Sequence, residues 1–100
     1  TLFRSDYVES SKWIRKAAEQ GHVDAQRVLG VMYANGNGVP QDSVEAYMWL
    51  TIAASNGNRH AEEARRTWLS EPTSISKEQI SEGDEMTRKW LEDFEKKNKE

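Results

Sequence analysis

The sequence has no cysteine and only two prolines among its 100 residues. Without cysteine, the chain can form no disulfide bond and has no thiol nucleophile or thiolate metal ligand. Its apolar runs extend over only a few residues, so we expect no transmembrane segment, and no signal peptide is visible. These absences indicate a soluble protein and leave its compartment unknown.

A large excess of charge of one sign is also missing. Fourteen lysines and arginines stand against 17 aspartates and glutamates, which gives a net charge of −3 at pH 7. The basic residues are interleaved with acidic ones, so no basic face is expected to form. We therefore expect neither a nucleic-acid partner nor a membrane partner.

An internal repeat is present. Residues 6–22 and 42–58 carry related sequences 36 positions apart. When the comparison is extended to residue 25, eight of 20 aligned positions are identical. A repeat of this period is typical of stacked supersecondary units. The identical pairs are Asp6/Asp42, Val8/Val44, Glu9/Glu45, Trp13/Trp49, Ala17/Ala53, Ala18/Ala54, Gly21/Gly57 and Ala25/Ala61.

Each copy of the repeat predicts one helix. Asp6 and Asp42 are each followed by glutamate three residues later, which predicts a helix start with a capping box. The helices should end at residues 20 and 56, because Gly21 and Gly57 suit a left-handed C-cap.

A different helix is predicted between the two copies, from Asp24 to about Asn35, followed by a glycine-rich turn over residues 36–41. Gly30 lies inside this helix, where glycine costs about 1 kcal/mol relative to alanine. We interpret it as a place of close contact with the alanine face of a neighbouring helix. The unit is thus helix, turn, helix, with antiparallel packing.

The C-terminal part predicts two more helices. Residues 59–69 keep helical spacing, and residues 70–74 form a linker. Ser76 and Gln79 predict a capping box at the start of the last helix, and residues 96–100 are expected to fray.

Four motifs together carry a resemblance to a known family. They are Ala17-Ala18-Glu19-Gln20-Gly21, Ala25-Gln26 through Leu29-Gly30 to Tyr33, the turn from Gly36 to Asp42, and Glu45-Ala46 to Trp49. The chain resembles the Sel-one-like repeat family, which is related to the tetratricopeptide repeats. Its tail, Ile75 to Trp90, is similar to the capping helix that often closes bacterial members.

The resemblance covers nearly the whole chain and implies an all-α fold: a short, right-handed α-α superhelix of about five helices in one domain, residues 1–100. It divides this domain into a partial repeat (6–22), a full repeat (24–58), a degenerate helix (59–71) and a capping helix (75–96). One departure is Arg27-Val28, where the family often has Tyr-Asn. In related repeats that asparagine hydrogen-bonds the backbone of a bound peptide, so we do not expect this repeat to hold a peptide backbone in that way.

The function that the resemblance implies is a protein-protein interaction module or adaptor, without catalysis, cofactor or metal. In helical solenoids the first helix of each unit lines the concave surface, which binds a partner protein or peptide. Arg27, Val31 and Asn35 fall on a face distinct from Leu29 and Tyr33, and they are our candidates for partner contact. The four tryptophans, at helical spacing, are interpreted as packing residues.

Two alternatives stay open at this stage. The N-terminal face of the 6–20 helix should be exposed, so the chain is either the C-terminal end of a longer array or a homo-oligomer formed through that face. The other alternative is an enzyme, since cysteine-rich relatives of the family have been linked with β-lactam binding and hydrolysis. This chain lacks the cysteines, and Ser74-Ile75-Ser76-Lys77 is interpreted as the start of a helix. His22 and His60, 38 residues apart, are interpreted as surface residues rather than metal ligands.

Overall fold

The computed structural model describes the backbone of residues 2–99 and the side chains of residues 8–99. Five helices follow one another within this range, and it contains no strand. They are α1 (Leu2–Glu19), α2 (Val23–Asn35), α3 (Ser43–Ser55), α4 (Arg59–Leu69) and α5 (Lys77–Lys99). The all-α class and the five helices are confirmed. None of the five is both long enough and apolar enough to cross a lipid bilayer.

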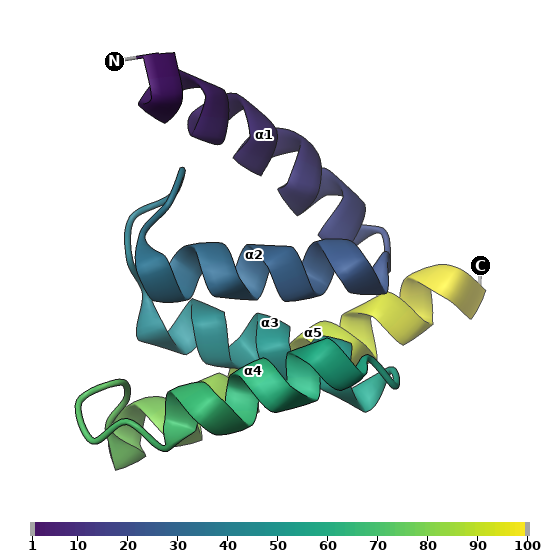
Figure 1. Ribbon diagram of the computed structural model, residues 1–100. Helices are drawn as coiled ribbons and strands as arrows, with labels where there is room; N and C mark the ends of the chain where they lie inside the picture. The colour runs from purple at the N-terminus through teal and green to yellow at the C-terminus, as the bar shows by residue number, and fades with distance from the viewer. Residues whose placement is uncertain (1, 100) are drawn as a thin grey trace.

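The helices are arranged around α3 (Figure 1). Helix α3 packs against α2 on one side and against α4 and α5 on the others, and α1 packs on α2. Helix α1 meets α2 near the turn that joins them and diverges from it towards the N-terminus. The C-terminal end of α5 emerges beside that same turn. This packing of neighbouring helices agrees with the expected helical-repeat superhelix.

Helix α3 supplies most of the core. A helix that is apolar on all sides is stable only when other elements cover all of its sides. The buried residues of α3 point in every direction around its axis, and Trp49, Leu50 and Ile52 are at most 2% exposed. They are Val44, Ala46, Tyr47, Met48, Trp49, Leu50, Ile52 and Ala53.

The predicted capping box of α3 is half correct. The Asp42 carboxylate accepts hydrogen bonds from the backbone N–H groups of Val44 (3.0 Å) and Glu45 (3.1 Å), as expected of an N-cap. The predicted second bond, from the Asp42 N–H to the Glu45 carboxylate, does not form. The Asp42 N–H donates instead to the Tyr33 carbonyl at 3.0 Å. The Glu45 carboxylate instead accepts the indole N–H of Trp49 at 3.0 Å.

Two predicted helix ends are wrong. Helix α1 begins at Leu2, so Asp6 is not its N-cap. Residues 2–5 contain neither glycine nor proline, and nothing in them interrupts the helix; the side chain of Asp6 lies outside the described residues. Helix α5 continues to Lys99 instead of fraying from residue 96. An i, i+4 ion pair between Lys99 and Glu95 (3.3 Å) supports its last turn.

The glycines behave largely as predicted. Gly21 and Gly57 end their helices with φ angles of +97° and +88°, in the left-handed region that glycine adopts most easily. Gly30 does mark a close contact, although the neighbour is not an alanine. A Cβ atom at this position would lie 2.8 Å from Cγ of Leu50 in α3.

Gln26 joins α2 to the end of α1. Its side chain is fully buried, and its amide donates a hydrogen bond to the Ala18 carbonyl at 3.1 Å. The Ala18 carbonyl lies in the last turn of α1, where it also accepts the Gly21 N–H at 3.1 Å, and the buried Gln26 donor adds a bond from α2. Gln26 therefore ties the C-terminal end of α1 to the first turn of α2.

We expect Gly30→Ala to destabilise the fold by up to about 2 kcal/mol, because overpacking against Leu50 outweighs the gain in helix propensity. Urea unfolding followed by circular dichroism measures this change. In a Leu50→Ala background the same substitution should cost less, since the contacting side chain is gone. An equal cost in both backgrounds would contradict the packing explanation.

Candidate functional site

A groove of about 440 Å³ opens between α2 and α4. Its floor is apolar and its rim is polar, an arrangement common in surfaces that bind peptides and ligands. The lining residues from α2 and α3 are Val31, Ala34, Asn35 and Leu50. Those from α4 and the turn after it are His60, Glu63, Ala64, Thr67, Trp68 and Glu71.

The sequence of α4 places one of its faces towards this groove. Within α4 the lining positions are 60, 63, 64, 67 and 68, the i, i+3, i+4, i+7, i+8 pattern of one helical face. The adjacent side is held against α3: Ala61 is fully buried, and Arg65 donates to the Thr51 hydroxyl (2.8 Å) and to the Tyr47 hydroxyl (3.1 Å). Arg65 thereby fixes the rotation of α4 that exposes the groove face.

Tyr47 extends this network to α5. Its hydroxyl donates to the Asp84 carboxylate at 2.6 Å, and the Arg65 guanidinium lies over its ring, 5.1 Å from the centroid. Burial, followed by the hydrogen bond to Asp84, raises the pKa of Tyr47, so its hydroxyl stays protonated at neutral pH. Next to the ring, Gly83 of α5 has no room for a side chain, since a Cβ would lie 2.5 Å from Cδ2 of Tyr47.

The three residues expected to contact a partner do not all line the groove. Val31 is half-buried in its wall, and Asn35 is exposed at its edge. Arg27 lies one turn before Val31 and outside the lining. Its Nε is buried without a hydrogen-bond partner among the described residues.

The α4 side of the groove escaped the sequence analysis. The 36-residue period contained the missing signal, because it relates Arg27, Val31 and Asn35 to Glu63, Thr67 and Glu71. The last three all line the groove. A shift of 36 positions from the three candidate residues therefore leads directly to the α4 side of the groove.

The tryptophans are packing residues with one exception. The Trp49 and Trp90 rings meet edge to face, with centroids 5.4 Å apart, and Trp90 stacks on Phe94 at 5.0 Å. Trp68 packs against the core and lines the groove. The prediction is wrong for Trp13, which is 70% exposed. Helix α5 covers the face of α3 that carries Trp49, whereas no described helix covers the equivalent face of α1.

A second cavity, of about 770 Å³, lies between α1, α3 and α5. Its walls combine aromatic rings with charges of both signs: Arg15, Lys89, Lys96 and Lys97 against Glu19, Glu45 and Asp93. Burial raises the pKa of Glu45 above its ordinary value of 4.5, against the opposing effects of the Trp49 hydrogen bond and the Arg15 charge.

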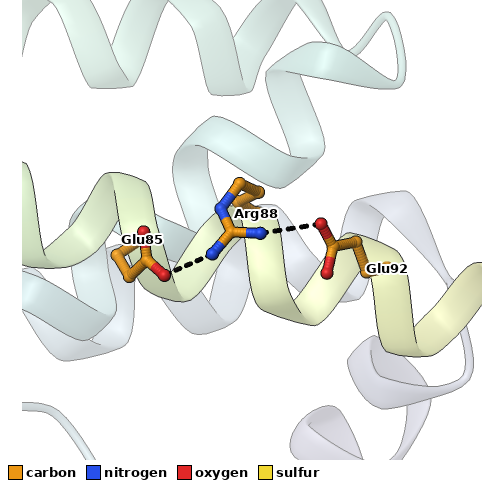
Figure 2. Close-up of polar contacts among 3 residues, drawn as sticks. All are labelled: Glu85, Arg88 and Glu92. Carbon is orange, nitrogen blue, oxygen red and sulfur yellow. Dashed lines mark hydrogen bonds and ion pairs between the residues drawn. The ribbon is translucent and has the colours of Figure 1, made fainter.

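Other polar groups serve the helices themselves. Figure 2 shows Arg88 bridging Glu85 and Glu92 along the exposed face of α5, and the Glu85 bond is the main cause that raises the pKa of Arg88. Ser76 and Gln79 form the predicted capping box, with bonds of 2.9 and 3.1 Å. Within residues 8–99, no cluster of three or more acidic, histidine or cysteine side chains could hold a metal ion.

Comparison with known proteins identifies the family. The Sel1 repeat matches residues 2–22 and 23–58, which together exceed half of the chain. The chain belongs to the Sel1 repeat family. Sel1 repeats indicate a helical module for protein interaction. The matched ranges meet at the turn between α1 and α2, where Gly21 and Gln26 set the geometry.

This Sel1 repeat chain is also similar to fungal proteins named chitin synthase regulator SKT5. The Malassezia restricta protein is 32% identical over 76 residues, which are 73% of this chain and 5% of that protein. The Saccharomyces cerevisiae protein is 32% identical over 77 residues, 77% of this chain and 11% of that protein. The chain thus spans a small part of these relatives. Both are fungal, so they do not support the bacterial type suggested by the tail.

We expect Glu45→Gln to raise the free energy of unfolding at pH 7. Because the folded-state pKa is raised, the carboxyl group contributes less stability as pH rises above about 4.5. Glutamine keeps an acceptor for the Trp49 indole and carries no charge. The advantage should shrink as pH falls towards 4.5, as urea unfolding at several pH values can measure. Glu78→Gln, at an exposed position of α5, controls for the loss of one charge, and a gain independent of pH would contradict the burial argument.

Proposed function

We propose that this chain is a protein-interaction module whose partner, a protein or a peptide, binds in the groove between α2 and α4. The observation that carries this proposal is the groove itself: an apolar floor of Ala34, Leu50 and Ala64 with polar groups at its margins. Membership of the Sel1 repeat family supports the class of function, while the partner must be found from the site.

Each candidate residue has a distinct role in this proposal. Val31 offers apolar surface in the α2 wall, and the exposed amide of Asn35 can both donate and accept hydrogen bonds at the edge. The Arg27 guanidinium, one turn away, supplies donors for a carbonyl or carboxylate of a longer partner segment. The module needs no catalytic group, and we propose that it is not an enzyme.

The division of the domain belongs to the same proposal. In it, the full repeat (24–58) and the degenerate helix (59–71) provide the two walls, and the helix after residue 75 acts as a cap. The Trp49–Trp90 contact supports the cap assignment, because α5 covers apolar surface of α3 that would otherwise face water.

We expect peptides selected by the immobilised chain from a random 12-residue phage library to bind in the groove. Addition of a selected peptide should shift the backbone amide NMR signals of Val31, Asn35 and Thr67 and leave the exposed face of α5 unchanged. Val31→Glu should weaken binding by about tenfold or more, because it places a charge in an apolar contact.

Ser81→Glu, at an exposed site of α5, is the matched control and should bind like the parent chain. Circular dichroism confirms that both variants fold. Equal binding by folded Val31→Glu and parent chain, or amide shifts confined to another face, would refute the groove assignment.

A second candidate function is self-assembly through α1, and the exposure of Trp13 favours it. The equivalent Trp49 is 2% exposed, so the repeat places a large aromatic ring on a face that its second copy buries. We expect the chain to associate at high concentration and Trp13→Ser to reduce that association. Light scattering across a concentration series measures the mass. A monomer at all concentrations would exclude this function and leave the groove proposal intact.

A further inference from the structure

The groove carries charge of one sign. Among residues 8–99, whose side chains the structure describes, Glu63 and Glu71 are the acidic residues that line it, and no lysine or arginine does so. Between and beside the two carboxylates lie apolar groups, including Trp68. A partner that fills the groove must therefore place cationic groups near the two carboxylates and apolar groups on the surface between them.

The two carboxylates are not engaged elsewhere in the part of the chain whose side chains are described, residues 8–99. No ion pair involves either of them there, although Glu62, outside the groove, pairs with Arg66 at 3.1 Å. Arg65 points away from the groove to Thr51 and Tyr47. Glu63 and Glu71 are thus available to an incoming cation.

Two cations lie near the groove without neutralising it. Arg59 precedes Glu63 by one helical turn, and Arg27 is the only cation of α2. Neither forms an ion pair with Glu63 or Glu71 in the described residues. Exposed pairs contribute only about 0–1 kcal/mol, so a transient pair with either arginine would not block a well-placed partner cation.

Resting on the proposed function, we propose that the groove is specific for a cationic, apolar segment of a partner protein. An apolar side chain of that segment packs on Leu50, Ala64 and Trp68, and flanking lysines or arginines pair with Glu63 and Glu71. Arginine suits this role because its guanidinium forms bidentate bonds to carboxylates.

The spacing of the carboxylates sets the spacing of the partner's cations. Glu63 lies within α4, and Glu71 lies in the turn after its last residue, Leu69, so the two carboxylates stand at different points along the groove. An extended segment rises about 3.3 Å per residue, so cations separated by several residues can reach both carboxylates. The net charge of −3 for the whole chain adds a long-range attraction for such a segment.

The test uses the same random 12-residue phage library, selected in parallel on the parent chain and on a Glu63→Lys, Glu71→Lys variant. The parent should enrich peptides with lysine or arginine on both sides of an apolar residue, and the variant should lose that enrichment. The matched control, Glu62→Lys with Glu78→Lys, changes the net charge equally at positions outside the groove and should select like the parent.

Affinity measurements on synthetic copies of the selected peptides complete the test. Replacing their flanking cations by glutamine should weaken binding to the parent by about tenfold, and rising salt should weaken the cationic peptides more than the glutamine ones. Peptides that bind the groove without a cation preference would overturn this inference and leave the proposed function standing. Selected peptides whose binding ignores Val31→Glu would overturn both.

Discussion

The burial of α3 on all sides is the constraint on which the rest of this molecule depends. Its buried residues point in every direction, so all of its sides must be covered for the helix to be stable, and α2, α4 and α5 cover them. Helices α4 and α5 each pack on α3 rather than on one another. The position of every other helix, apart from α1, thus follows from covering this one segment.

That constraint also separates the two sides of the molecule. Helix α5 covers the Trp49 side through Trp90 and Phe94, while α2 and α4 stand on the other side with Leu50 between them. The bonds of Arg65 to Tyr47 and Thr51 hold α4 in one rotation. Because that rotation is fixed, one face of α4 becomes the wall of the groove. Stability and the candidate binding surface come from adjacent faces of the same helix, and Trp68 contributes to both.

Local signals in the sequence predicted the helices well and their ends less well. Caps at Asp42 and Ser76 and positive φ at Gly21 and Gly57 depend on neighbouring residues alone, and they were found. The Glu45 bond to Trp49 could not be found this way, because it depends on the Tyr33 carbonyl already holding the Asp42 N–H. Likewise, the contact at Gly30 was expected, but its partner Leu50 depends on how α2 crosses α3.

The sequence by itself determined the all-α class, the family and the helix-turn-helix unit, since the 36-residue period and its glycines act through short-range backbone preferences. It also placed Val31 and Asn35 on a face apart from Leu29 and Tyr33. Only the tertiary structure decided that Trp49 is buried while its repeat equivalent Trp13 is exposed, and that Glu63 and Glu71 face the same groove as Val31. The repeat equivalence of two residues does not specify these differences, because burial and charge juxtaposition depend on which helix packs against each face.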